Sequence, residues 1–429
     1  MPLLLRLREI LRRAGLRLGT FEYLEKWVVL GSIIGVVGGL AALTFYYLLE
    51  LCGWIFRQLW SLPLGVQLSL IIGGAISGFL VFHYAPEAEG HGTDAFIEAF
   101  HVRWGKIRSV VPFIKTVASS ITIGSGGSAG REGPIALIAS GVASALASRL
   151  HLSARDRRIL IVCGAASGIG SIFKAPLGAS IFGVEVLYKR DLEVEGLMPA
   201  LISSIVGYSI FSSVVGWGPV FKCPPYIFKS PVELLFFALL GLASGLVAIL
   251  YVKVFYGLKS AFFDRIPTIP HLKPVIGAGL LGILAFFTPQ VLGMGYDYVQ
   301  EALCGNLPLA LMLILAFSKI FATSFTISSG GSGGVFAPSL FIGAMLGGAL
   351  GKLFALIAPA IVTQPAAYAL VGMASFFAAA GKVPVASIIM VCEMTGNYNL
   401  LVPIMFASAI SYIVSGDATI YASQLPRRS

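Results

Sequence analysis

The sequence predicts an all-α integral membrane protein with an inverted repeat and broken helices that meet at the bilayer midplane. Three observations support this fold class. The 429-residue chain is 57% hydrophobic and only 12% charged, and apolar runs long enough to span a bilayer recur throughout it. One polar, glycine-rich stretch occurs twice, each time inside long apolar sequence. Irregular backbone is tolerated at membrane depth only where protein buries it or where it lines a watery cavity.

The repeat is visible in two motifs that occur in the same order in each half. Thr122–Pro134 reads TIGSGGSAGREGP, and Thr326–Pro338, 204 positions further on, reads TISSGGSGGVFAP, with eight of thirteen residues identical. A proline nine residues before a glutamate then follows in each half, as Pro176–Glu185 and as Pro384–Glu393. The order of these motifs predicts two homologous halves.

The chain divides into a short entry segment and one membrane domain. Residues 1–26 are basic and predict an amphipathic helix on the cytoplasmic surface. We expect residues 27–429 to form a single transmembrane domain, with repeat 1 at about 27–217 and repeat 2 at about 231–415. We expect no cytosolic regulatory domain. The net charge is +10, and arginines both precede the first apolar block and close the chain, which predicts cytoplasmic termini in the plasma (inner) membrane and no nucleic-acid partner.

Apolar blocks in chain order predict the membrane segments, and a polar, acidic insertion at Ala85–Phe100 is too polar to face lipid. The main blocks are Trp27–Leu49, Leu68–Tyr84, Ile135–Leu150, Ile159–Tyr188, Leu201–Trp217, Leu234–Tyr251, Val275–Phe287, Leu309–Phe325, Ala367–Val391 and Leu400–Val414. Lys115 and Lys319 occupy matching places in the two halves, and we expect both to extend their ammonium groups to a membrane interface.

The glycine-rich stretches have the chemistry of an anion site. Glycine lets backbone approach an ion closely, and a helix that starts just after it directs free N–H groups and a positive dipole end toward the gap. Two such helix starts facing one another near the midplane are a recurring transporter arrangement. Glu132 lies in the first stretch, and an ionisable residue inside a membrane indicates a functional site.

These motifs resemble those of the CLC chloride channels and chloride/proton antiporters, over almost the whole chain. GREGP at Gly130–Pro134 is similar to the family's external-gate motif, and GGVFAP at Gly333–Pro338 to its second anion-site motif. CEMTGNY at Cys392–Tyr398 and IYASQL at Ile420–Leu425 resemble two later segments, the second of which carries the pore tyrosine. The resemblance implies a homodimer with two independent pores, with chloride and protons as its partners.

The resemblance also implies roles for single residues. Glu132 would be the gating glutamate, which occupies an anion position when ionised and swings away when protonated. The amides of Val335 and Phe336 and the hydroxyl of Tyr421 would bind the anion. The full expected set of anion-binding residues is Val335, Phe336, Tyr421, His91, Gly92, Arg131 and Gly133, with no metal ligand and no cofactor.

Two positions depart from the family pattern. His91 stands where the family's G-S-G-I-P motif has its serine, because Gly90–Asp94 reads G-H-G-T-D. His91 could be a buried, neutral, hydrogen-bonded histidine with no ligand role. If it lines the pathway, we expect it to make anion flux depend on pH separately from Glu132, and a His91→Ser variant tests this. Val186 stands where many antiporters of the family carry an internal proton-transfer glutamate, so a passive voltage- or pH-gated channel is the alternative to anion/proton antiport.

Simpler structural roles compete with these functional ones. Glu132 could pair with its neighbour Arg131, and Tyr421 could mark the membrane interface. For Glu185 and Glu393 the structural role is the favoured prediction, because matched carboxylates after the same proline suit residues that cap or brace helices in both halves.

Other classes of protein fit the sequence less well. Gly330–Gly333 matches the G-x-S-G pattern of intramembrane serine proteases, but none of the five histidines follows Ser332, so we expect no enzyme. A cation carrier would need converging carbonyls and carboxylates rather than glycine amides. The five cysteines are isolated, which predicts neither a metal site nor a disulfide framework.

Overall fold

The computed structural model describes residues 23–428, and every regular element in this range is helical. The expected amphipathic helix at 1–26 lies almost wholly outside the described residues; its last positions, from Tyr23 onward, belong to the first long helix. The first half contains α2 (Tyr23–Arg57), α3 (Gly65–Tyr84), α4 (Thr93–His101), α5 (Val110–Gly124), α6 (Glu132–Arg149), α7 (Ala154–Phe173), α8 (Pro176–Glu185) and α9 (Val194–Val215).

The second half contains a matching series of helices. These are α10 (Leu234–Ala261), α11 (Lys273–Phe287), α12 (Tyr296–Leu303), α13 (Leu309–Ile327), α14 (Phe336–Ile357), α15 (Ala367–Gly381), α16 (Pro384–Thr395) and α17 (Leu401–Val414). Short 3₁₀ turns connect several of them, at Gln58–Ser61, Pro86–Ala88, Pro231–Glu233, Phe263–Arg265, Pro270–Leu272 and Pro289–Val291.

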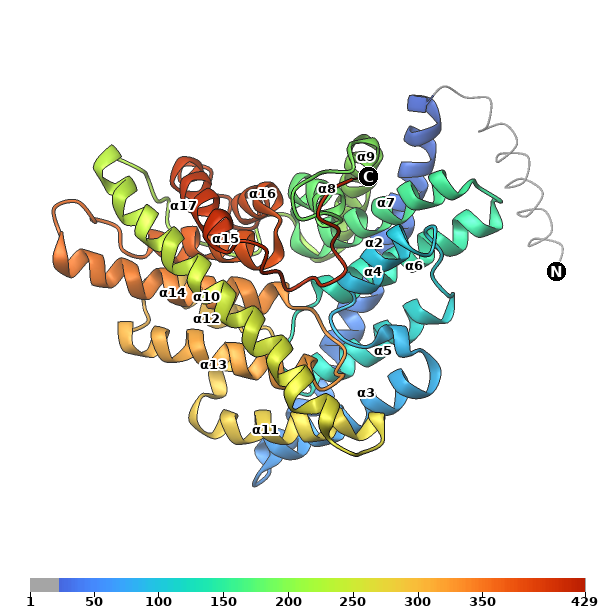
Figure 1. Cartoon of the computed structure of the whole chain (residues 1–429), viewed down its shortest axis with the longest axis horizontal. Helices are drawn as coiled ribbons and strands as arrows, with labels where there is room; N and C mark the ends of the chain where they lie inside the picture. Colours follow the sequence, from blue (N-terminus) through green and yellow to red (C-terminus); the bar gives the residue numbers. More distant parts are fainter. Residues whose placement is uncertain (1–22, 429) are drawn as a thin grey trace.

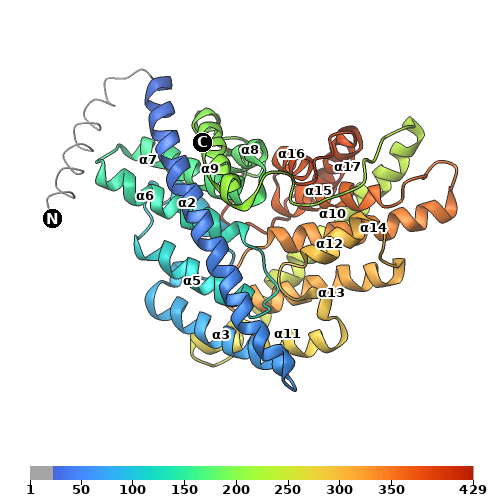
Figure 2. The same cartoon turned by 180° about the vertical axis from the view of Figure 1, so that it is seen from behind.

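The two halves pack in the same way. In the first half α6 packs on α7 and α2 runs along α9; in the second, α14 packs on α15 and α10 runs along α17. Figure 1 shows α10 crossing the front of the molecule, and Figure 2, turned by 180°, shows α2 crossing it in the same direction. The halves meet where α3 packs on α11 and where α8 packs on α16.

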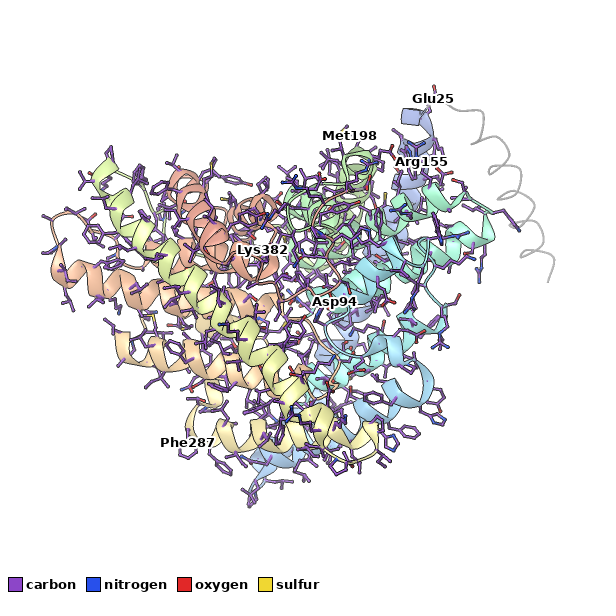
Figure 3. The ribbon with its side chains drawn as sticks, viewed as in Figure 1. Glu25, Asp94, Arg155, Met198, Phe287 and Lys382 are labelled. Carbon is purple, nitrogen blue, oxygen red and sulfur yellow. The ribbon has the colours of Figure 1, made fainter. Side chains whose placement is uncertain are left out.

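Helix lengths and surface composition fit a membrane. Seven helical segments of the described chain are long and apolar enough to cross a bilayer: Glu25–Ser61, Gly65–Tyr84, Val194–Val215, Pro231–Arg265, Pro270–Phe287, Leu309–Ile327 and Phe336–Ile357. Large apolar side chains such as Trp54, Leu235, Phe287 and Leu356 are exposed on the outside, and Figure 3 shows Phe287 at the edge of the molecule. In water such a surface would aggregate, so it suits contact with lipid.

Two apolar runs that read as continuous are each broken into two helices. Ile159–Tyr188 divides between α7 and α8, and Ala367–Val391 divides between α15 and α16. At both breaks a lysine, Lys174 or Lys382, adopts the left-handed conformation, with φ of 53° and 56°. A proline that lacks an N–H then begins the next helix in each case.

The C-terminal segment connects the second half back to the first. After α17 the chain runs across the molecule toward α8 and α9, seen as the dark red end in Figure 1. Along this path Ile420 N donates to Ala380 O at 2.8 Å, and Lys189 N donates to Leu425 O at 2.8 Å. The segment therefore places Tyr421 between the two halves.

Candidate anion-binding site

The two glycine-rich stretches meet at the centre of the molecule, as the sequence predicted. Gly130 N donates to Gly334 O at 2.7 Å, and Gly334 N donates back to Gly130 O at 2.6 Å. A second link joins Gly333 N to Gly90 O at 3.1 Å. These reciprocal bonds satisfy backbone groups that would otherwise be unpaired in an irregular, buried segment, and they bring the starts of α6 and α14 together.

Glu132 is the first residue of α6, and its carboxylate lies at the start of α14. Glu132 Oε1 accepts a hydrogen bond from Ala337 N at 2.8 Å. The residue is only 4% exposed, and Oε2 accepts no hydrogen bond from any residue between 23 and 428. A carboxylate therefore occupies the place where a helix start attracts a negative charge.

The backbone around this carboxylate has no room for additional side chains. A Cβ atom on Gly130 would lie 2.2 Å from Glu132 Oε1, and one on Gly334 would lie 2.7 Å from the same oxygen. Glycine at these two positions is what lets the carboxylate fold back over the joined chains.

Val335 and Phe336 lie where the family resemblance places them, at the start of α14. Val335 is the residue before the helix, and Phe336 is its first residue. The Phe336 ring packs against Phe173 and Phe377, with centroids 5.1 and 4.4 Å away. The sequence analysis missed Ala337, the next residue, although any helix start offers several free N–H groups.

Arg131 does not form an ion pair with Glu132 in the described structure, so the simpler alternative for Glu132 is wrong. The Arg131 guanidinium donates to Ile172 O at 3.2 Å. Its central carbon lies 5.6 to 5.8 Å from the ring centroids of Tyr46, Phe173 and Tyr296. These aromatic faces stabilise the cation, and its contact with an anion stays a prediction.

Tyr421 is buried, which contradicts the alternative that it marks a membrane interface. It is 1% exposed, and its ring lies 5.4 Å from that of His91 and 6.5 Å from that of Phe182. The C-terminal segment thus brings Tyr421 to His91, more than 300 residues earlier in the chain. His91 lines a cavity and Tyr421 packs against its ring, and the contact of either residue with an anion stays a prediction.

Gly92 and Gly133 allow two chain segments to cross. A Cβ on Gly133 would lie 1.9 Å from His91 O, and one on Gly92 would lie 2.8 Å from Gly133 O. Gly92 also has a φ of 81°, a conformation that favours glycine. Their close packing explains why both are glycines, independently of any anion contact.

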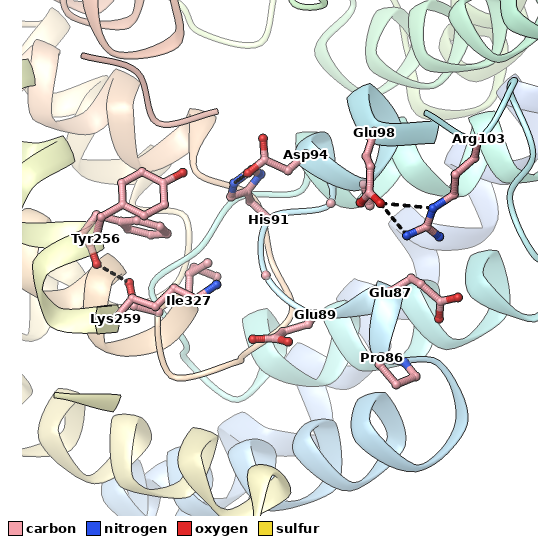
Figure 4. Close-up of a pocket in the computed structure, with 15 residues that line it drawn as sticks. Pro86, Glu87, Glu89, His91, Asp94, Glu98, Arg103, Tyr256, Lys259 and Ile327 are labelled. Atoms are coloured by element: carbon pink, nitrogen blue, oxygen red, sulfur yellow. Dashed lines mark hydrogen bonds and ion pairs between the residues drawn. The ribbon is translucent and has the colours of Figure 1, made fainter. Parts of the chain in front are cut away.

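A cavity of about 210 Å³ lies beside His91. Figure 4 shows His91 and Asp94 at the top of this region, Tyr256 and Lys259 to the left, Glu98 and Arg103 to the right, and Glu89 below. Figure 3 places Asp94 near the middle of the molecule. Thr93, Glu132, Phe182 and Phe336 surround a second gap that is too small to hold a water molecule, so the open space lies beside His91 rather than at Glu132.

The expectation that Lys115 and Lys319 extend to an interface is wrong, because both are completely buried. Lys115 Nζ donates to Ala88 O at 2.9 Å and to Gly90 O at 2.7 Å. Lys319 Nζ donates to the carbonyls of Val291 and Gly293, both at 2.8 Å. Each ammonium group donates to two carbonyls of the segment that precedes a short helix. These buried hydrogen bonds hold the lysine inside the protein instead of at the membrane interface.

Glu185 and Glu393 cap helices, as the favoured prediction held. Glu185 accepts from Val385 N at 3.1 Å and Ala386 N at 2.7 Å. Glu393 accepts from Leu177 N at 3.2 Å and Gly178 N at 2.7 Å. Each carboxylate, at or near the end of α8 or α16, therefore caps the start of the other helix.

Both glycine-flanked serines bind across the two halves. Ser332 Oγ lies 2.9 Å from Ser119 Oγ and donates to Ala88 O at 2.9 Å. Ser128 Oγ lies 3.2 Å from Thr323 Oγ1. None of these partners is a base that could activate a nucleophile, so the contacts favour a structural role over the protease alternative.

Comparison with known proteins gives the family. The sequence pattern described as "Voltage gated chloride channel" matches residues 73–416. The chain is 29% identical to the H(+)/Cl(-) exchange transporter ClcA of Vibrio campbellii, over 95% of this chain and 90% of that protein.

Two solved structures share the fold. A CLC-type fluoride/proton antiporter superposes with a TM-score of 0.82 at 25% identity, covering 94% of this chain and 98% of that one. A slow cyanobacterial Cl−/H+ antiporter superposes with a TM-score of 0.80 at 23% identity, covering 91% and 93%. The chain belongs to the CLC family of voltage-gated chloride channels and their transporter relatives.

Proposed function

We propose that this chain exchanges chloride or similar small anions for protons across a membrane, with Glu132 as gate and proton carrier. The hydrogen bond from Ala337 N to Glu132 Oε1 carries the proposal, because it puts a titratable negative charge on the amides of α14. The similar Vibrio campbellii protein is named as an H(+)/Cl(-) exchange transporter.

The exchange follows because the Glu132 carboxylate and the anion compete for the same amides at the start of α14. When Glu132 is ionised, its carboxylate occupies the start of α14 and excludes an anion. When it is protonated, it no longer balances the helix dipole, and an anion takes over the amides of Val335, Phe336 and Ala337. Amide dipoles replace water around the ion without a full counter-charge, so the ion is also able to leave.

The remaining site residues would line the route of the anion. We assign the hydroxyl of Tyr421 and the ring of His91 to one stretch of this route, because the two rings lie 5.4 Å apart and His91 lines the 210 Å³ cavity. Gly92 and Gly133 allow close approach of the backbone, and Arg131 supplies positive potential near the gate. No cofactor is required, because the anion and the proton are the transported species.

Proton movement in liposomes tests this function. The purified chain is reconstituted, a chloride gradient is imposed, and external pH and chloride are recorded together. We expect chloride movement one way to drive proton movement the other way, with no flux when only sodium or potassium is supplied. A fluoride arm is included because one similar structure is a fluoride/proton antiporter.

A passive chloride channel is the second candidate, and Val186 is the observation that favours it. Val186 is completely buried, and its carbonyl accepts a hydrogen bond from Gln424 Nε2 at 3.1 Å. A valine cannot carry a proton at this position. Robust chloride flux with no proton movement in the same liposomes would favour the channel.

We further propose a homodimer in which each protomer has its own pathway. Exposed apolar side chains on α9 and α17, namely Met198, Ile205, Val402 and Met405, support it, since these helices lie on one side of the molecule, with α8 and α16 (Figure 1). Chemical crosslinking in detergent tests it, and a single monomer band at all crosslinker concentrations would contradict it.

The proposed location is the plasma (inner) membrane, with both termini in the cytoplasm and repeats at about 27–217 and 231–415. Arginines near both chain ends support this orientation. Lys115 and Lys319 make equivalent contacts in the two halves, and so do Glu185 and Glu393, which supports the repeat. Reporter fusions at each terminus, active only on one side of the membrane, test the orientation.

A further inference from the structure

His91 and Asp94 form a hydrogen-bonded pair at the start of α4. His91 Nε2 lies 3.1 Å from Asp94 Oδ2. The other carboxylate oxygen, Oδ1, accepts a hydrogen bond from Ser423 N at 3.0 Å. Asp94 thus ties the ring of His91 to the C-terminal segment that carries Tyr421.

This pairing decides which nitrogen of His91 carries a hydrogen. The backbone N–H of Ser423, which donates to Oδ1, favours the ionised form of Asp94, and an ionised carboxylate only accepts hydrogen bonds. Nε2 must therefore be the N–H nitrogen. In a neutral imidazole Nδ1 then has a lone pair and no hydrogen.

Nδ1 is the unusual atom of the pair. His91 is 6% exposed, and Nδ1 has no hydrogen-bond partner among the described residues. A lone pair repels an anion, so Nδ1 serves as a donor to an anion only when the ring is doubly protonated.

The surroundings of the ring favour an anion. Gly92, which follows His91, precedes the first residue of α4 and has no side chain to cap the helix, so the first amides of α4 remain available. His91 also lines the 210 Å³ cavity. A helix start, a cavity and an unpaired buried nitrogen therefore occur together.

Other titratable groups near the ring come from several elements. Tyr421 faces it from the C-terminal segment. Tyr256 and Lys259 line the same cavity from α10, and Glu87, Glu89, Glu98 and Arg103 line it from the segments before, within and after α4. Lys115, from α5, is held by the carbonyls of Ala88 and Gly90. Asp94 is the charged group in direct contact with the ring within the described range, and it stabilises the imidazolium.

We propose that Asp94 makes anion binding beside His91 conditional on protonation of the imidazole, so that a small anion and a proton bind here together. This inference rests on the proposed function, because an anion must reach the cavity. Anion affinity at this place therefore falls as pH rises, because linkage couples the bound proton to the bound anion.

Calorimetry with chloride as the probe tests the linkage. The full chain carrying E132Q removes the proton that Glu132 would take up. Chloride is titrated between pH 6 and 8 in two buffers of different ionisation enthalpy, which gives the number of protons bound per chloride. We expect a proton uptake above zero near pH 7 and weaker binding at pH 8 than at pH 6.

Three further variants in the E132Q background give the controls. H91Q cannot be protonated and should show no proton uptake. D94N offers either an oxygen or an N–H to His91, which frees Nδ1 to carry the hydrogen, so the pH dependence should become shallower. D94E keeps a carboxylate, so the pH dependence of chloride binding should be retained. Size-exclusion profiles identify any variant that fails to fold.

The outcomes separate the two proposals. Chloride binding that is equally strong at pH 6 and 8 in E132Q, or unchanged proton uptake in H91Q, would overturn the inference and leave the proposed function standing. Absence of chloride binding and flux in the unmodified chain at every pH would overturn the proposed function itself.

Discussion

Glu185 and Glu393 each accept two backbone hydrogen bonds from the start of the helix that carries the other. Glu185 binds Val385 N and Ala386 N, and Glu393 binds Leu177 N and Gly178 N. A carboxylate at a helix start accepts hydrogen bonds from free N–H groups, and the helix dipole stabilises its negative charge. This reciprocal arrangement joins α8 to α16, and it explains why both glutamates persist inside an apolar region.

The first prediction concerns these caps. Glu185→Gln and Glu393→Gln keep the size of the side chain but remove its charge, so each should lower the free energy of unfolding by about 1 kcal/mol, within the range for loss of a helix cap. The measurement is thermal unfolding in detergent. Glu50→Gln, at an exposed position, is the control, and a control shift as large as that of the two caps would contradict the prediction.

The second prediction concerns the gate. Glu132→Gln cannot release or bind a proton, so it should abolish proton movement while chloride flux continues. The measurement is simultaneous pH and chloride recording in liposomes with an imposed chloride gradient. Proton coupling that survives in this variant would show that Glu132 is not the proton carrier.

The third prediction concerns Gly130. The three atoms nearest to a methyl group there all belong to the Glu132 carboxylate, at 2.2 to 2.6 Å. Gly130→Ala should therefore push the carboxylate off the amides of α14 and raise chloride flux relative to proton flux.

A double variant isolates that cause. In Glu132→Ala the carboxylate is absent, so adding Gly130→Ala should change chloride flux little. An equal effect of Gly130→Ala with and without Glu132 would mean that the substitution acts on the backbone instead.

The fourth prediction concerns the buried lysines. Lys319→Met leaves the carbonyls of Val291 and Gly293 without the donor that the structure gives them, and an unsatisfied buried group costs about 1–3 kcal/mol. In Lys115→Met the carbonyls of Ala88 and Gly90 keep donors in Ser332 Oγ and Gly333 N. Lys319→Met should therefore unfold at a clearly lower temperature than the parent, or fail to fold, and Lys115→Met should lose less stability. Lys253→Met, at an exposed position, is the matched control. Unchanged unfolding of Lys319→Met would show that its carbonyls find other partners.

Several features could be predicted because they depend on local sequence. Hydropathy indicates the membrane class, since the bilayer requires long apolar segments. The two glycine-rich stretches indicate the duplication and the helix starts, and an acid inside apolar sequence singles out Glu132. An apolar segment, a helix start and an isolated acid each lie within a few tens of residues, and the duplication is visible once the two stretches are compared.

Other features depend on contacts between distant parts of the chain. The sequence did not show that Ala337 would be the partner of Glu132, 205 positions away, nor that Asp94 would hold both His91 and Ser423. It also misplaced Lys115 and Lys319, because a lysine in apolar sequence fits an interface and a buried carbonyl pair equally well.

The sequence alone therefore determined a duplicated helical membrane protein with a titratable acid at one of two helix starts. Only the tertiary structure decided which groups face one another, because hydrogen bonds between the halves form only when both have folded together. The physical reason is that a buried polar group must find a partner, and the chain's order does not state which partner lies within reach.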